Sequence, residues 1–327
     1  MRVLLTGGCG YIGGTTARLL RRLGHEVVVL DDLSTGHRAA WDGAFHRCDL
    51  TDAAALSAAL AAAGGTWDGV VHFAARAYVG ESVAQPLRYW RQNLLPILHL
   101  CEALPGVPFV FSSTCAVYGE PESVPITEDL PPRPVNPYGE TKLAAERLLA
   151  ARERAGQGPA VALRYFNAAG AEPDGEHGED HDPEERLIPR AMRAALGVGP
   201  PLEVFGDDWP TPDGTCIRDY VHVLDLADAH VAALERLHRG DSGGVWNLGT
   251  GRGHSVREVL AAVERALGTP VPHAVRGRRP GDPAVLVAAP ARAERDLDWT
   301  PRYPELEAIV ETAAAWFRRH PRGYADA

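Results

Sequence analysis

Short apolar runs alternate with segments of helical spacing through the first half of the chain. The apolar runs are RVLLT (2–6), HEVVVLD (25–31), AFHRCDL (44–50), GVVHFAA (69–75), PFVFSS (108–113) and AVALRYFN (160–167). The segments with helical spacing lie at 13–23, 52–63, 82–104 and 137–155. Near-continuous apolar strands that alternate with helices are typical of a parallel sheet covered on both faces. The pattern therefore predicts a doubly wound α/β domain.

The pattern changes after Asn167. The next stretch, AGAEPDGEHGEDHDPEERL, is polar and acidic, turn residues follow, and helical spacing returns at 222–239 and 255–267. We expect two units, a larger domain over 1–166 and a smaller C-terminal lobe over 167–327, with 218–240 returning to the larger domain. The glycine-rich NLGTGRG (247–253) predicts a turn, because no helix and ribose-binding acid follow it as a phosphate loop requires.

Composition narrows the choice of partners. The chain of 327 residues has a formal net charge of -10 and a pI of about 5.7, which argues against nucleic acid or an anionic membrane as the main partner. Its five cysteines are scattered without a C-x-x-C pair. This indicates neither disulfides nor zinc and favours a reducing, cytoplasmic location. Since no apolar segment approaches the length of a membrane span, we expect neither a span nor a signal peptide.

A glycine-rich turn follows the first expected strand. In TGGCGYIGG, Gly7, Gly10 and Gly13 stand between a strand and the start of a helix, where backbone amides can bind a pyrophosphate. Asp31 ends the second strand, where a carboxylate can bind the adenosine ribose hydroxyls and repel a 2′-phosphate. The chain is therefore expected to use NAD rather than NADP. Asp49 and Leu50 either lie beside the adenine or belong to the start of the next helix.

One lysine stands out, because every other residue among the 33 Lys and Arg is arginine. Lys142 follows Tyr138 by four positions on a helix that Asn136-Pro137 begins, so both side chains share a face. A compact ammonium can hold ribose hydroxyls and lower the pKa of a neighbouring phenol, which makes Tyr138 a candidate general base. The alternative is a solvated i,i+4 pair.

Hydroxyl side chains end the strand that precedes this helix. Ser112, Ser113 and Thr114 stand where the carboxyl edge of a parallel sheet opens toward a ligand, although such a cluster can also be a simple turn. Cys115 lacks a His/Asn partner pattern and is expected to be a packed side chain. The acidic stretch EHGEDHD (176–182) is expected to be solvated, so we assign no metal site.

These residues together resemble the extended short-chain dehydrogenase/reductase family, and within it the UDP-glucose 4-epimerases (UDP-galactose 4-epimerases). The segments that carry the resemblance follow the family's order over nearly the whole chain: TGGCGYIG, DDLSTGHR, VVHFAA, VGESV, FSSTCAVYG, NPYGETKLAAE, RYFNAAGA, IRDYVHVLDLADAH, NLGTG and RRPGDPA. The resemblance implies a Rossmann-type sheet with a smaller C-terminal substrate-binding lobe.

The resemblance also implies roles for individual residues. Tyr138 is expected to be the catalytic base, Lys142 its partner on the nicotinamide ribose, and Thr114 the active-site hydroxyl. The positions expected to contact NAD are Gly7, Gly10, Tyr11, Ile12, Gly13, Asp31, Asp32, Asp49, Leu50, Phe73, Ala74, Ala75, Asn93, Tyr138, Lys142 and Phe166. Those expected to contact the UDP-sugar are Thr114, Tyr138, Asn167, Leu187, Phe205, Arg218, Arg279, Asp282 and Leu286.

The implied reaction is the 4-epimerisation of a UDP-hexose, UDP-galactose to UDP-glucose, in galactose metabolism. Tyr138 removes the 4-hydroxyl proton while hydride passes from C4 to NAD, the 4-keto sugar turns over, and hydride returns to its other face. Relatives are commonly homodimers through two long helices, which 82–104 and 137–155 could supply.

Three positions depart from the family pattern. Ala77 replaces a lysine of some relatives, and Pro96 stands in Asn93-Leu94-Leu95-Pro96 where the helix is expected to be distorted. Leu286 matches the residue that controls access of N-acetyl sugars, and its intermediate size leaves that specificity open. Cys115-Ala116 argues against a 4,6-dehydratase, which needs Asp-Glu there. A UDP-N-acetylhexosamine or UDP-uronate 4-epimerase stays possible, as does a non-catalytic NAD-bound regulator, although the latter predicts a damaged Tyr/Lys pair.

Overall fold

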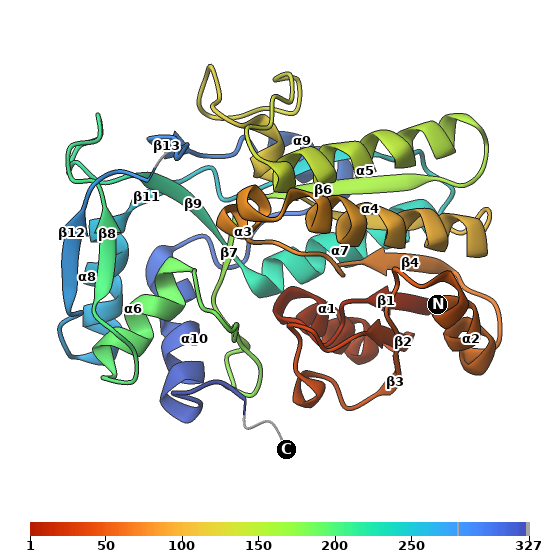
Figure 1. Cartoon of the computed structure of the whole chain (residues 1–327), viewed down its shortest axis with the longest axis horizontal. Coiled ribbons are helices and arrows are strands. Elements are labelled where there is room, and N and C mark those ends of the chain that lie inside the picture. Colours follow the sequence, from red (N-terminus) through yellow and green to blue (C-terminus); the bar gives the residue numbers. More distant parts are fainter. Residues whose placement is uncertain (280, 325–327) are drawn as a thin grey trace.

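A computed structural model describes residues 1–279 and 281–324 and is organised around a parallel sheet of seven strands (Figure 1). The strand order is β10-β6-β5-β4-β1-β2-β3, and every neighbouring pair is parallel. The strands are β1 (Arg2–Thr6), β2 (Glu26–Asp31), β3 (Ala44–Arg47), β4 (Gly69–His72), β5 (Phe109–Thr114), β6 (Ala160–Tyr165) and β10 (Gly244–Leu248). The expected doubly wound α/β fold is confirmed.

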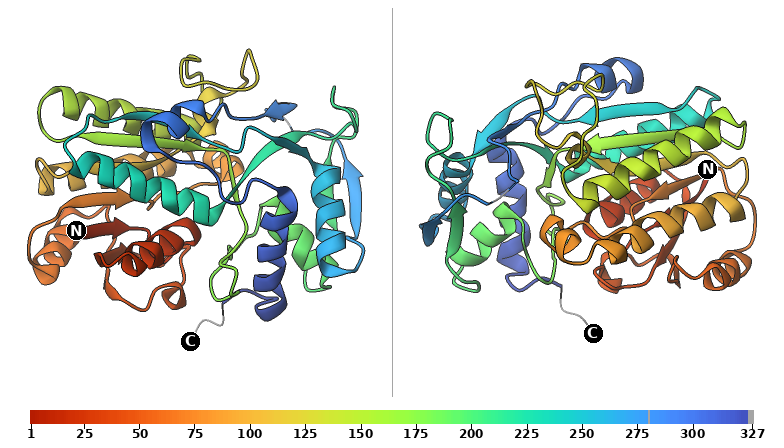
Figure 2. Two further views of the ribbon diagram at one scale, coloured as in Figure 1. Left: turned by 180° about the vertical axis from the view of Figure 1, so that it is seen from behind. Right: turned by 45° about the horizontal axis from the view of Figure 1, so that its top comes forward.

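Helices cover both faces of this sheet (Figure 2). One apolar core lies between the sheet and α1 (Tyr11–Arg22), α7 (Val223–His238) and α9 (Ala291–Leu297). The core on the other face is closed by α2 (Ala53–Ala63), α4 (Pro86–Ala103) and α5 (Pro137–Arg154). Since the inner strands are buried from end to end, their sequences are almost continuously apolar rather than alternating.

The smaller lobe packs beside the carboxyl ends of the strands. A small sheet joins β11 (Gly253–Ser255), β9 (Ile217–His222) and β13 (Val285–Leu286), with β7 (Asn167–Ala169) also paired to β9, while β8 (Leu202–Phe205) pairs with β12 (His273–Arg276). A separate apolar core gathers α6 (Leu187–Ala195), α8 (Val256–Leu267) and α10 (Leu306–Arg319). Across the described ranges, no helix is both long enough and apolar enough to cross a membrane.

Several details differ from the sequence prediction. Residues 244–248, which we placed in the smaller lobe, form the seventh strand of the large sheet beside β6. The expected helix over 82–104 is two helices, α3 (Val79–Ala84) and α4, and α4 continues past Pro96 to Ala103. Two short 3₁₀ segments, η1 (Arg38–Ala40) and η2 (Cys115–Tyr118), complete the fold. Pro280 of the RRPGDPA segment and residues 325–327 of the expected lobe lie outside the described residues.

Candidate active site

A cavity of about 1030 Å³ lies between the carboxyl ends of the large sheet's strands and the smaller lobe. All the predicted site residues except Asn93 and Lys142 line it. From the large domain these are Gly7, Gly10, Tyr11, Ile12, Gly13, Asp31, Asp32, Asp49, Leu50, Phe73, Ala74, Ala75, Thr114, Tyr138 and Phe166, and from the lobe Asn167, Leu187, Phe205, Arg218, Arg279, Asp282 and Leu286. Carboxyl ends of parallel strands are where ligands bind in open α/β sheets.

The glycine-rich turn at one end of the cavity has room only for glycine at positions 7 and 13. A Cβ at Gly13 would lie 2.1 Å from the Gly7 carbonyl oxygen, and a Cβ at Gly7 would lie 2.6 Å from the Ala74 amide nitrogen. Helix α1 begins here with no side chain capping its amides and no acidic residue in its first turn. These unshielded amides carry partial positive charge toward the cavity, which fits a pyrophosphate.

Carboxylates stand beside this turn. Both oxygens of Asp31 accept backbone hydrogen bonds, from Cys9 at 3.0 Å and from Leu33 at 2.8 Å, so the carboxylate is held rigidly at the end of β2. Asp49 binds the amide and hydroxyl of Thr51, whereas the residue that caps α2 is Asp52. Asp49 is therefore free to line the cavity rather than begin the helix. The turn and a fixed carboxylate at the end of β2 together fit NAD.

Helix α5 carries the Tyr/Lys pair. Its first turn is set by Asn136, whose side chain accepts a hydrogen bond from the Gly139 amide at 2.9 Å, and by Pro137. Four-residue spacing then places Tyr138 on the cavity wall with Lys142 one turn deeper. Lys142 is only 3% exposed, donates to the Ser112 carbonyl at 2.8 Å, and lies 6.0 Å from the centre of the Tyr138 ring. The alternative of a solvated pair is excluded by this burial.

Burial dominates the titration of both groups. It lowers the pKa of Lys142 to about 7, although the nearby Glu146 carboxylate acts in the opposite direction. Burial has the opposite effect on Tyr138, whose pKa it raises. The Thr114 hydroxyl and the Arg186 guanidinium act against this rise. The expected lowering by Lys142 is therefore not what this structure shows, because desolvation outweighs the neighbouring charges.

Only one of the three hydroxyl candidates faces the cavity. Ser112 binds the Tyr165 hydroxyl, and Ser113 donates to Glu146. Thr114 lines the cavity, accepts a hydrogen bond from the Ala116 amide at 3.1 Å, and acts on Tyr138 through a hydrogen bond. Of the three, Thr114 is the one placed to share a substrate proton with Tyr138.

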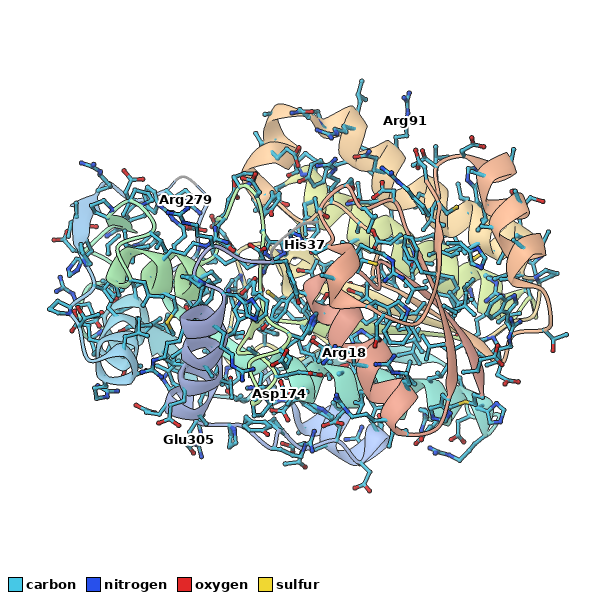
Figure 3. All side chains as sticks on the ribbon, turned by 90° about the horizontal axis from the view of Figure 1, so that it is seen from below. Arg18, His37, Arg91, Asp174, Arg279 and Glu305 are labelled. Atoms are coloured by element: carbon cyan, nitrogen blue, oxygen red, sulfur yellow. The ribbon has the colours of Figure 1, made fainter. Side chains whose placement is uncertain are left out.

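The opposite end of the cavity is cationic and aromatic. Arg218 on β9 lies 3.8 Å from the Asp282 carboxylate, and the Arg279 guanidinium stacks 4.4 Å from the centre of the Phe205 ring. Figure 3 shows Arg279 in the smaller lobe, on the side that meets the large domain. Leu286 pairs with Arg218 in the small sheet. Two guanidinium groups beside an aromatic ring can hold a diphosphate and a flat base.

One part of the cavity wall was not predicted from the sequence. The segment EHGEDHD, expected to be solvated, is buried over residues 177–180, and Glu179 and His181 line the cavity with Arg186. Burial and the neighbouring Glu184 raise the pKa of Glu179 to about 8, against the pull of Arg186, whose Nε lies 3.0 Å away. The sequence feature that could have indicated this burial is Arg186, which follows the acidic stretch.

We assign no separate chemistry to this acidic wall or to two further candidates. Glu179, His181 and Glu184 form a group that could hold a metal ion, but the adjacent arginine already supplies positive charge to Glu179. Burial raises the pKa of the Cys115 thiol to about 12, so it is no nucleophile at neutral pH. The amides of the 247–253 loop donate to the Asp219 carboxylate, which agrees with a structural turn.

Predicted residues outside the cavity lie directly behind its wall. Asn93 binds the backbone of Arg76 and the Thr141 hydroxyl, so it fixes the segment after β4 against α5. Tyr138 thus lines the cavity with Lys142 and Asn93 behind it, and Arg218 and Arg279 line the part that the smaller lobe supplies. The arrangement can move a proton beside a dinucleotide while a diphosphate is held at a distance.

Known proteins are similar to this chain over nearly its whole length. A model of the NAD dependent epimerase/dehydratase family matches residues 3–249. The UDP-glucose 4-epimerase of Halalkalibacterium halodurans is 46% identical over 328 residues, 99% of this chain and 98% of the relative. The crystal structure of UDP-glucose 4-epimerase from Brucella ovis in complex with NAD is 49% identical, with a TM-score of 0.92 over 97% of this chain and 98% of that one. The enzyme from Bifidobacterium longum, solved with NAD⁺ and UDP, is 36% identical, with a TM-score of 0.92 over 99% and 100%. The chain therefore belongs to the NAD dependent epimerase/dehydratase family.

Proposed function

We propose that the chain catalyses the NAD-dependent 4-epimerisation of a UDP-hexose, which interconverts UDP-galactose and UDP-glucose in galactose metabolism. One observation carries the proposal: a single cavity joins the glycine turn, the Tyr138 and Thr114 hydroxyls, and the arginines of the smaller lobe. The full-length relatives named UDP-glucose 4-epimerase, at 43–47% identity, support it.

The proposed roles follow from position. The turn at Gly7, Gly10 and Gly13 and the Asp31 carboxylate would hold the pyrophosphate and adenosine ribose of NAD, and Lys142 the nicotinamide ribose. When bound, NAD supplies a reversible two-electron acceptor at the sugar C4 and a positive charge near Tyr138. We assign the cofactor to residues 1–166 and 218–248, since β10 completes their sheet, and the UDP-sugar mainly to the smaller lobe.

Tyr138 acts as the base in this proposal. It removes the proton of the sugar 4-hydroxyl, and Thr114 shares that proton through its hydroxyl. Arg218 and Arg279 hold the diphosphate, and Phe205 covers the uracil, so the 4-keto sugar can rotate about a fixed anchor. Return of the proton from Tyr138 completes the inverted alcohol.

The test is to incubate the purified protein, without added NAD, with UDP-galactose and separately with UDP-N-acetylgalactosamine, and to follow the gluco products by chromatography. Conversion of UDP-galactose is expected, and the ratio of the two rates measures what Leu286 admits. Tyr138→Phe should lower kcat by at least about 10²-fold. Absence of conversion with both substrates, even after NAD is added, would overturn the proposal.

We also propose that the protein is a cytoplasmic homodimer. Apolar side chains are exposed on α3 and α4: Leu87 is 82% exposed, and Val83 and Trp90 are also at the surface. Arg91 on α4 projects outward from the molecule beside them (Figure 3). A patch of this kind on a helix pair suits a second copy of the chain. Its five free cysteines suit a reducing compartment. Light scattering should give twice the 35.1 kDa of the chain, and Leu87→Glu should give the monomer.

A further inference from the structure

A buried ion pair lies directly behind the Tyr/Lys pair. Glu146 stands one turn beyond Lys142 on α5, so Tyr138, Lys142 and Glu146 follow one helix face at four-residue intervals. Two hydrogen bonds join Glu146 to Arg164 of β6, at 2.9 Å and 2.5 Å. The side chains are 5% and 6% exposed. A carboxylate and a guanidinium that are both removed from water persist only with good geometry and full pairing.

The remaining hydrogen bonds of this pair reach the residue before Thr114 and the 3₁₀ segment that follows it. The Ser113 hydroxyl donates to Glu146, and Arg164 donates to the Tyr118 hydroxyl at 2.9 Å. Tyr118 in turn donates to Asn247 of β10 at 2.7 Å. The network therefore binds α5 to three neighbouring strands and to the 3₁₀ segment that follows Thr114.

We propose that Glu146 and Arg164 are positioning residues that hold Lys142 and Thr114 in their working places, an inference that rests on the proposed roles of Tyr138, Lys142 and Thr114. The two residues before Thr114 are tied to two successive turns of α5. The Ser112 carbonyl accepts from Lys142 at 2.8 Å, and the Ser113 hydroxyl donates to Glu146. A shift of Glu146 would therefore move the strand end that carries Thr114 relative to the helix that carries Tyr138.

The charges of Glu146 and Arg164 give this ion pair a second role. The groups facing Lys142 are Glu146 and Tyr138 on its own helix and His72 on β4. His72 is neutral near pH 7, because burial and Lys142 lower its pKa to about 3. Glu146 therefore supplies the negative charge that opposes the lowering of the Lys142 pKa by burial. Arg164 offsets part of that charge, and Tyr118 lies beyond Arg164. Neutralising Glu146 leaves Arg164 uncompensated and adds positive potential at Lys142.

The test uses the holoenzyme and compares Glu146→Gln with Glu172→Gln. Glu172 is a matched control, since its side chain is 3% exposed and pairs with Arg18 and Arg22, yet it lies outside the cavity lining. Arg18, labelled in Figure 3, lies on α1, which covers the opposite face of the large sheet from α5. Each variant is scored by thermal unfolding, by its retained NAD, and by kcat and KM for UDP-galactose from pH 5.5 to 9.5.

The proposal expects Glu146→Gln to move the alkaline limb of the kcat profile down by about one pH unit and to reduce kcat at pH 8.5 about tenfold, with KM little changed. Glu172→Gln should lose similar thermal stability without moving the limb. An unmoved limb in Glu146→Gln, or an equal movement in both variants, would overturn the proposal.

A second variant covers the case in which Glu146→Gln does not fold. The double variant Glu146→Gln/Arg164→Met removes both charges and leaves no uncompensated guanidinium. It should refold, keep a reduced kcat, and show a smaller shift of the alkaline limb than the single variant. Wild-type kcat and profile in the double variant would overturn the positioning role. Wild-type activity in Tyr138→Phe would instead overturn the assignment on which the inference rests.

Discussion

Replacing Gly13 by alanine should weaken both the fold and the binding of NAD. The added Cβ would lie 2.1 Å from the Gly7 carbonyl oxygen and 2.9 Å from its carbon. Because ordinary contacts are about 3.5 Å, the turn must move by about 1.4 Å. Gly7 resists such a move, since its amide donates to the Leu30 carbonyl at 2.9 Å and a Cβ built on it would lie 2.6 Å from the Ala74 amide nitrogen.

Overpacking of this kind costs about 1–3 kcal/mol, and alanine returns at most about 1 kcal/mol through its helix propensity. A net loss of about 1.5 kcal/mol corresponds to a Tm lower by roughly 2 °C, because the entropy of unfolding of a 327-residue chain is about 0.7 kcal/mol/K. A similar loss at the pyrophosphate would weaken NAD binding about tenfold.

Calorimetry with and without NAD checks the fall in Tm and the loss of NAD affinity. Substitutions at two other glycines separate the effect on stability from the effect on NAD binding. Gly277→Ala adds a Cβ into open space and should leave Tm within about 1 °C. Gly10→Ala meets nothing closer than 3.4 Å, so it should lose NAD affinity with little loss of Tm. If Gly13→Ala kept wild-type Tm and bound NAD within twofold of wild type, the steric reasoning would be wrong.

Three further predictions follow from charges. Asp31→Asn should narrow the preference for NAD over NADP by at least about tenfold in binding titrations, because the carboxylate at the end of β2 no longer repels a 2′-phosphate; an unchanged ratio would count against the ribose assignment. The pKa of Glu179 is raised to about 8, so the folded state retains a proton that the unfolded state has lost between pH 5 and 8, and this group destabilises the fold as pH rises. Glu179→Gln, which mimics the protonated form, should therefore gain stability relative to wild type between pH 5 and 9 in urea unfolding, and a constant difference would contradict the shift. Burial lowers the pKa of four histidines to about 3 or 4, so they stay neutral in the fold and charge only on unfolding: His72, His177, His222 and His230. Each should lower the free energy of unfolding by about 2 kcal/mol between pH 7 and pH 5. Equal free energies of unfolding in urea at pH 7 and pH 5 would show that these rings are not buried.

The large sheet could be predicted because its inner strands are buried on both faces. β5 contributes FVFSST with every residue buried, so its sequence shows a short apolar run that no helical period explains. β10 was missed for the opposite reason. It is an edge strand whose first two residues are only half-buried, and its partner β6 is far away in the sequence. Nothing local marks that pairing.

The site residues also divide into those that the sequence could predict and those that it could not. Gly13, Asp31, Tyr138 and Lys142 could be predicted because spacing fixes their relative places on a turn, a strand end and a helix face. The acidic wall around Glu179 could not. Carboxylates are usually solvated, and burial here depends on arginines that only the folded lobe brings beside them, as with Arg193 and Asp180 at 2.6 Å. For the same reason, the effect of Arg186 on the active site could not be predicted from the sequence.

The path of the chain between the two cores limits how this protein can be cut or recombined. After β6 the chain enters the smaller lobe, returns for α7 and β10, leaves again, returns for α9, and ends with α10 in the lobe. No single crossover point in the gene could exchange one lobe for that of another enzyme. A new specificity must then be acquired by substitutions within an intact chain, and an isolated lobe for ligand screening would have to be built from several rejoined fragments.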